Sequence, residues 1–251
     1  MADEERVRAG VWSSLAGGTA ELMARSGADF VVLDAQHGLY DAGSLAATLL
    51  QCGSLPGPVF VRMADQSPAG IGRVLDLGAA GVIVPLVDDA VQAAAVAAAC
   101  RYPPRGDRSW GPMTGLVGRP DPEPAAANAA VLCGVMVETR GGLEAVQAIA
   151  ATAGVDMVFV GPFDLSLALG MDVDDLVDDT SATSPLARIV TACRSAGIRS
   201  AVFGGAPERA QRLRRFGFTD VVVFTDAGLL AAAATVELDR WRAPQAGVTD
   251  V

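Results

Sequence analysis

The chain has 251 residues, of which 51% are hydrophobic, so it can form one large domain with a substantial buried core. Its formal net charge of −10 argues against nucleic acid or an anionic membrane as the natural partner. All 19 basic residues are arginine, which excludes a lysine Schiff base to a carbonyl substrate and a lysine-containing phosphate loop.

Short β-branched runs alternate along the chain with alanine-rich helical patterns. The expected strands are 10–12, 30–34, 59–62, 81–85, 132–137, 157–161, 199–202 and 220–224. The expected helices are 19–26, 41–52, 71–77, 88–101, 142–151, 185–196, 207–216 and 228–242. Most of the strands are continuously apolar, as is typical of parallel strands covered on both faces. Several helices are followed by a glycine at a C-cap position, namely Gly27, Gly78, Gly197 and Gly217.

Eight such strand–helix units in about 250 residues predict an α/β fold, a single-domain TIM (β/α)₈ barrel over 1–251. A doubly wound sheet is the alternative, but no G-x-G-x-x-G follows an early strand. Two regions interrupt the pattern: 102–124 is predicted to be a long loop, and 172–184 a polar surface excursion. The last helix, 228–242, is a candidate contact with a neighbouring subunit.

The cysteines and the N-terminal residues indicate in which cellular compartment the protein is expected. No C-x-x-C pair occurs, so we expect four buried free thiols and neither a disulfide framework nor a zinc knuckle. The stretch 1–6 is acidic and lacks the apolar core of a signal peptide, and no apolar run is long enough to span a bilayer. We therefore expect a cytoplasmic protein without membrane or nucleic-acid partners.

Two acidic residues follow neighbouring predicted strands, where a TIM barrel carries its catalytic groups. Glu138 follows the strand 132–137, and Asp164 follows the strand 157–161. Adjacent carboxylates suit a hard divalent cation whose other ligands are substrate oxygens and water. The structural alternatives are a strand-end glutamate and, for Asp164, a helix N-cap.

Other polar residues fall on the same predicted rim. Arg62 ends an apolar strand, where it is a candidate either to bind a substrate carboxylate or to form an ion pair inside the barrel mouth. His37, the only histidine, follows Asp34 and is a candidate acid–base group, with a hydrogen-bonded rim histidine as the alternative. Asp76 is a candidate partner of His37 or a surface aspartate. Trp12 ends the first strand on this rim.

Two glycine-containing turns are candidate anion sites. Gly161 and Pro162 follow a strand, and the turn 109–111 lies in the long loop. Either turn is a candidate to present backbone amides to an anion, and either is equally consistent with simple turn chemistry.

Taken together, nine strings in this order and spacing resemble the HpcH/HpaI aldolase family, the metal-dependent class II pyruvate aldolases. The resemblance extends from Trp12 to about Ala227, nearly the whole chain. The strings are GVWS at 10–13, SGADF at 26–30, LDAQH at 33–37, VR at 61–62, VLDLGA at 74–79, VPLV at 84–87, RYPPRG at 101–106, VET at 137–139 and FVGPFDLS at 159–166.

The resemblance implies a modified TIM barrel that forms a homo-trimer or homo-hexamer with swapped C-terminal helices. It implies Mg²⁺, Mn²⁺ or Co²⁺ held by Glu138 and Asp164, with Arg62 binding the 2-oxo acid. His37, supported by Asp76 and with Asp34 at the same strand end, would be the acid–base group near the aldehyde. The implied reaction forms or cleaves the C3–C4 bond of a 4-hydroxy-2-oxo acid through a pyruvate enolate, with a metal in place of lysine as electron sink.

Two positions depart from the family pattern. Many relatives have glutamate where this chain has Gln36, and often glutamine where it has Met136, whose thioether cannot donate a hydrogen bond. Two other functions therefore stay open. One is an acyl-CoA lyase of the citramalyl or malyl type, which the short chain and the His37 motif disfavour. The other is a metal- and ligand-binding barrel with weakened catalysis.

Overall fold

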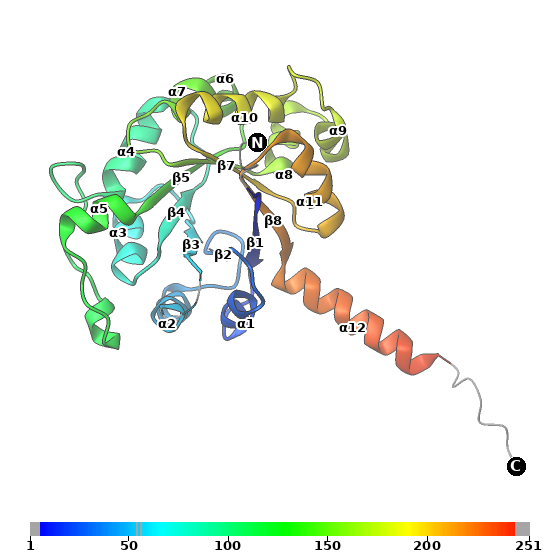
Figure 1. Cartoon of the computed structure of the whole chain (residues 1–251), viewed down its shortest axis with the longest axis horizontal. Helices are drawn as coiled ribbons and strands as arrows, with labels where there is room; N and C mark the ends of the chain where they lie inside the picture. The colour runs from blue at the N-terminus through cyan, green and yellow to red at the C-terminus, as the bar shows by residue number, and fades with distance from the viewer. Residues whose placement is uncertain (1–5, 54, 56, 244–251) are drawn as a thin grey trace, which may run out of the picture.

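The computed structural model describes residues 6–53, 55 and 57–243. Eight parallel strands close a barrel in chain order, so that the last strand pairs with the first, and helices surround it (Figure 1). The strands are β1 Arg8–Ser13, β2 Phe30–Asp34, β3 Val59–Arg62, β4 Gly81–Val84, β5 Leu132–Val137, β6 Met157–Val160, β7 Arg199–Phe203 and β8 Asp220–Thr225. The predicted TIM barrel is confirmed.

The helices cover the outside of the barrel, and many begin at a polar cap or at proline. Asp41, Ser67 and Ser184 each accept a backbone amide of the first turn, and proline follows Ser67 and Ser184 directly. The helices are α1 Thr19–Arg25, α2 Ala42–Cys52, α3 Pro68–Asp76, α4 Ala90–Cys100, α5 Pro124–Ala130, α6 Arg140–Glu144, α7 Val146–Ala150, α8 Pro162–Leu169, α9 Val173–Asp178, α10 Pro185–Ala196, α11 Pro207–Leu213 and α12 Asp226–Arg242, with 3₁₀ turns η1 Thr114–Val117 and η2 Arg214–Phe216.

Some helices differ from the sequence prediction. The predicted loop 102–124 contains η1 and is followed directly by α5, which the prediction missed. The predicted surface excursion 172–184 contains α9, which buries Leu176 and Val177 against the core. The predicted helix 142–151 starts earlier and is broken into α6 and α7 at Ala145. Helix α8 begins at Pro162, directly after Gly161, and so starts earlier than the helix implied by the alternative of Asp164 as an N-cap.

The strands separate two cores because successive side chains point to opposite faces. Val31 and Leu33 on β2 pack outward against the helices, whereas Val32 between them packs inside the barrel. The inner core is aromatic and sulfur-rich, and it contains Trp12, Phe30, Val32, Phe60, Ile83, Met136, Met157, Phe159, Ala201 and Val222. All four cysteines are buried and free, as expected.

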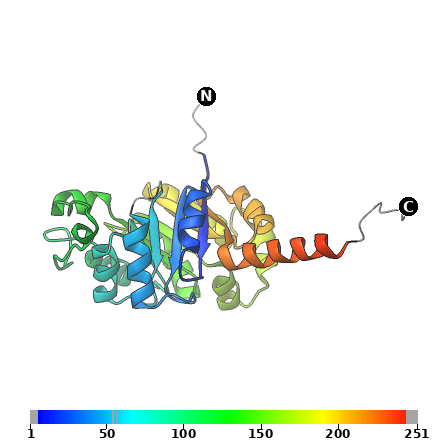
Figure 2. The ribbon, with the colours of Figure 1, turned by 90° about the horizontal axis from the view of Figure 1, so that it is seen from below.

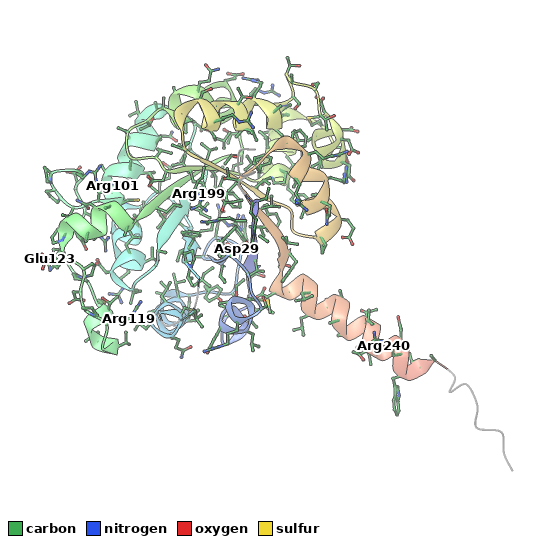
Figure 3. All side chains as sticks on the ribbon, viewed as in Figure 1. Asp29, Arg101, Arg119, Glu123, Arg199 and Arg240 are labelled. Atoms are coloured by element: carbon green, nitrogen blue, oxygen red, sulfur yellow. The ribbon has the colours of Figure 1, made fainter. Side chains whose placement is uncertain are left out.

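Helix α12 leaves the barrel and projects sideways from it (Figure 2). It contacts β1, β8 and α1, but every residue from 228 to 242 is exposed, including Leu230 and Trp241. Figure 3 shows the labelled Arg240 on this helix, far from the barrel. Within the described part of the chain no helix is long and apolar enough to cross a bilayer. The stretch 1–6 predicted the absence of a signal peptide, and its residues 1–5 lie outside the described residues.

Candidate active site

A pocket of about 250 Å³ lies at the carboxyl ends of the strands, where TIM barrels carry their active sites. It brings together six of the predicted site residues, while Glu138 lies beside one of them, Gly161. Asp76 and Pro162 do not line it. The lining residues are Trp12, Ser14, Asp34, His37, Arg62, Met136, Phe159, Gly161, Phe163, Asp164, Phe203 and Thr225.

Glu138 and Asp164 converge at Gly161. A methyl group placed on Gly161 would lie 2.7 Å from Oε2 of Glu138 and 3.6 Å from Oδ2 of Asp164, so any larger residue here would displace the Glu138 carboxylate. Asp164 lies in the first turn of α8, whose N-cap is Gly161, so the alternative role of Asp164 as the cap is wrong. Two oxygen-donor side chains thus face one small space.

The environment of Glu138 is poor in compensating charge. The side chain is only 3% exposed. Burial raises its pKa and the nearby Asp164 carboxylate adds to this, while an amide hydrogen bond from Leu86 and the Arg62 guanidinium oppose the rise without cancelling it. A buried carboxylate with an acidic neighbour is stabilised by a cation, so this pair fits a divalent metal. Among the described residues, no histidine, cysteine or further acidic side chain joins Glu138 and Asp164. Substrate and water would therefore have to fill the other positions around a bound metal.

The backbone at Leu86 fixes Glu138 and is itself unusual. Leu86 has φ +56°, a left-handed conformation that is rare for a bulky residue, and its amide donates to Oε1 of Glu138 at 2.9 Å. The side-chain amide of Gln66 donates to the carbonyls of Pro85 and Leu86 at 3.2 and 2.8 Å. Sequence reasoning missed both Gln66 and Leu86. Strain of this kind collects at functional sites.

Asp34 and Arg62 form a buried ion pair at the ends of β2 and β3. Nε and Nη2 of Arg62 donate to the two Asp34 oxygens at 2.9 and 2.6 Å, and Trp12 Nε1 donates to Oδ2 at 3.1 Å. The Arg62 guanidinium also lies over the Trp12 ring at 4.9 Å. Burial alone would raise the pKa of Asp34, but the Arg62 guanidinium holds it below its ordinary value. Arg62 therefore reaches the pocket as a fixed cation with N–H groups to spare.

His37 lies at the mouth of the pocket on the turn after β2. Its amide and that of Gln36 donate to Oδ1 of Asp34 at 3.1 and 3.0 Å, which orders the turn. Its exposed imidazole lines the pocket and is accessible to a substrate. Gln36 contributes its backbone here, and its side chain does not line the pocket.

Asp76 does not share a pocket with His37 within one chain. Its Oδ1 accepts a hydrogen bond from Arg108 Nη2 at 2.7 Å, and it lines a separate hollow with Tyr102. The turn 109–111, the second candidate anion site, lies in the same region, because Trp110 packs on Tyr102 at 5.0 Å. Pro162 is buried and has no N–H, so only its neighbours have amides that can bind an anion.

The floor and one wall of the pocket are apolar. Met136 is 2% exposed and lies beside Gly161. Phe159, Phe163 and Phe203, to which sequence reasoning gave no role, continue this surface to the mouth. Their aromatic character was visible in the sequence, but their convergence depends on barrel closure.

Comparisons with known proteins agree with this geometry. The family model described as HpcH/HpaI aldolase/citrate lyase matches residues 8–233. The hydroxypyruvate/pyruvate aldolase of Chromohalobacter salexigens is 34% identical over 94% of this chain and 93% of its own length. The 2-keto-3-deoxy-L-rhamnonate aldolase of Salmonella gallinarum is 33% identical over 94% of this chain and 89% of its own. A crystal structure of a family member from Burkholderia cenocepacia superimposes with a TM-score of 0.86 at 30% identity and covers 96% of each chain.

Proposed function

The chain belongs to the HpcH/HpaI aldolase/citrate lyase family and is a carbon–carbon lyase, and we propose that it is a divalent-metal-dependent aldolase. In this proposal it forms or cleaves the C3–C4 bond of a 4-hydroxy-2-oxo acid, with pyruvate as the nucleophilic half. The observation that carries the proposal is the convergence of Glu138 and Asp164 at Gly161, in the same pocket as Arg62 and His37.

Glu138 and Asp164 would hold the cation, which is Mg²⁺, Mn²⁺ or Co²⁺. Their oxygen donors and shared negative charge suit such an ion, and the family generally depends on one. When bound, the metal supplies Lewis-acid stabilisation of negative charge on the keto oxygen, which a lysine imine supplies in other aldolases. The chain contains no lysine for that alternative.

Arg62 binds the carboxylate of the 2-oxo acid through the N–H groups that Asp34 does not occupy. Asp34 is a positioning residue, because its oxygens are already engaged by Arg62, Trp12 and two backbone amides. A guanidinium fixed in this way loses little conformational entropy when it binds an anion.

His37 handles the proton of the 4-hydroxyl group. In cleavage it accepts this proton as the C3–C4 bond breaks, and in synthesis it returns a proton to the aldehyde oxygen. Imidazole is suited to both steps near neutral pH. Its exposed position at the mouth matches the aldehyde half of the substrate, which lies farther from the carboxylates.

We also propose that the protein forms a homo-oligomer. Asp76 supports His37 only if a second copy of the chain contributes it, because within one chain Asp76 lies outside the pocket that His37 lines. A homo-trimer or homo-hexamer with swapped α12 helices would also cover the exposed apolar residues of α12, among them Leu230, Leu238 and Trp241.

Exhaustive chelation followed by metal addition tests the proposal. We expect EDTA to abolish pyruvate release from a panel of 4-hydroxy-2-oxo acids, and Mg²⁺ or Mn²⁺ to restore it. Full activity after chelation would refute the metal requirement. No pyruvate from any member of the panel, with metal present, would refute the aldolase function.

Met136 favours one second candidate, a metal- and ligand-binding barrel with weakened catalysis. Its buried thioether puts no hydrogen-bond donor beside the carboxylates. That candidate predicts calorimetric binding of Mn²⁺ and pyruvate without release of pyruvate from the panel. The acyl-CoA lyase alternative predicts instead turnover of citramalyl- or malyl-CoA.

A further inference from the structure

We propose that the acceptor half of this active site is built for aldehydes with an apolar or aromatic carbon chain, and that Phe163 is a determinant of this specificity. The proposal rests on the proposed function, since it concerns the aldehyde that the same pocket would receive.

Aromatic side chains form a continuous wall from the floor of the pocket to its mouth. The Trp12 ring packs against Phe159 at 5.6 Å and edge-on against Phe203 at 5.1 Å, and Phe203 packs edge-on against Phe163 at 6.4 Å. All four rings line the pocket. The carbon chain of an aldehyde that extends from its reacting carbon toward the mouth of the pocket would therefore contact aromatic side chains.

Phe163 is held at the mouth although 41% of it is exposed. The Arg209 guanidinium lies over its ring at 4.7 Å, and Nη1 of Arg209 donates to the Gly204 carbonyl at 3.2 Å. A large aromatic ring that is held by a guanidinium and lines the pocket offers a fixed surface for burying apolar atoms of a ligand.

The polar groups on this side are mostly occupied. Ser14 Oγ donates its proton to Asp226 at 3.0 Å, and Thr225 Oγ1 accepts the Gly228 amide at 3.0 Å. Both oxygens of Asp34 are engaged by Arg62 and Trp12. The His37 imidazole and the spare N–H groups of Arg62 serve the 4-hydroxyl group and the carboxylate of the substrate in the proposed function. Among the other side chains that line the described pocket, the Thr225 hydroxyl is the main free donor.

A polyhydroxylated chain would therefore lose water without regaining its hydrogen bonds. Each hydroxyl buried without a partner weakens binding, whereas apolar atoms gain from leaving water. Sites discriminate between substrates through such differences in transition-state binding. The lining thus favours an apolar or aromatic aldehyde over a sugar-like one.

The test compares aldol formation from pyruvate with two aldehydes of equal carbon skeleton, butanal and D-erythrose, using the full-length protein with Mn²⁺. Rates are referred to the free aldehyde concentration measured by NMR. We expect kcat/KM to be at least about ten-fold higher for butanal, and benzaldehyde to be accepted as well as butanal or better. An equal or higher value for D-erythrose would overturn the proposal.

Two variants test whether Phe163 causes the preference for butanal over D-erythrose. Phe163→Ser is expected to lower the ratio of kcat/KM for butanal to kcat/KM for D-erythrose about five-fold or more. Any effect of the substitution on the adjacent Asp164 changes both values equally and therefore cancels in this ratio. Leu167→Ser is the matched control, because Leu167 lies on the same helix, is 77% exposed and does not line the pocket, so the ratio stays unchanged. An unchanged ratio in Phe163→Ser would remove Phe163 from the proposal.

Exchange of the pyruvate methyl protons in D₂O separates this proposal from the proposed function, because it requires no aldehyde. Exchange together with a preference for D-erythrose would overturn the acceptor proposal alone. No exchange, and no aldol product from any aldehyde, would overturn both.

Discussion

Replacing Asp34 by asparagine should destabilise the protein strongly, although the side chain keeps its size. The substitution removes the charge that binds Arg62 Nε and Nη2 at 2.9 and 2.6 Å, and it leaves a guanidinium whose side chain is only 10% exposed without a counterion. Removing one partner of a buried pair costs about 3–5 kcal/mol. Because this pair lies in a pocket that water reaches, we expect about 3 kcal/mol, the lower end of that range. Urea unfolding at pH 7 without added metal measures it.

The pH dependence provides a second measurement. Burial acts to raise the pKa of Asp34, but Arg62 holds it below the ordinary value, so the ionised pair stabilises the fold fully above the unfolded pKa of about 3.9. This contribution is lost as the pH falls through the still lower folded pKa. The difference between wild type and Asp34→Asn should therefore be constant from pH 5 to pH 8 and shrink in stronger acid. A loss below about 1 kcal/mol at pH 7, or a difference that grows on acidification, would refute the reasoning.

Four further outcomes are expected. Because burial raises the pKa of Glu138, its ionised form opposes folding above its ordinary pKa, so Glu138→Gln should raise the Tm at pH 7 in EDTA and abolish calorimetric Mn²⁺ binding; a lower Tm would contradict this. Gln66→Leu removes both hydrogen bonds to the backbone at Leu86, and Mn²⁺ affinity should fall about three- to ten-fold at fixed pH, whereas unchanged affinity would make that contact incidental. His37→Ala should slow retro-aldol cleavage by about 10²–10⁴-fold and pyruvate methyl exchange less, and equal losses would assign histidine to enolisation. Trp241→Asp should lower the oligomeric mass in light scattering if α12 is swapped, and an unchanged mass would speak against the swap.

The barrel was predictable from sequence because the strands are short, largely apolar runs separated by helical patterns, and several of these runs end in polar residues. Strands 30–34, 59–62 and 132–137 coincide with the observed bounds, and the others differ by one or two residues at one end or, for the first strand, at both ends. The short helices α5 and α9 were not predictable, because each lasts only one to two turns within a segment of loop-like composition. Their stability comes from packing of residues such as Leu176 on the barrel.

The rim residues were predictable as a group, but their contacts were not. Asp34 and Arg62 stand opposite each other because β2 and β3 pair in that register, which a sequence does not reveal until the barrel is closed. The left-handed conformation of Leu86 has no local signal, since leucine rarely adopts it. The sequence predicted that Asp76 lies on a helix, now α3. It did not predict that Asp76 pairs with Arg108, because this depends on how the loop after α4 folds back onto α3.

The four acidic residues at the carboxyl ends of β2, β5, β6 and β8 differ in how completely their charge is compensated. Asp34 is bound by a guanidinium, and Asp226 accepts hydrogen bonds from the hydroxyls of two serines and from three backbone amides.

Burial alone would raise the pKa of both residues, yet these donors hold both below the ordinary value. Glu138 has a single amide donor and an acidic neighbour, Asp164, and its pKa moves in the opposite direction.

A cation attracted to the rim thus gains least from the two saturated carboxylates and most from the pair at Gly161. The same hydrogen bonds that exclude Asp226 as a metal ligand fasten the start of α12 to the pocket wall at Ser14, so the helix that leaves the barrel is anchored in the active site.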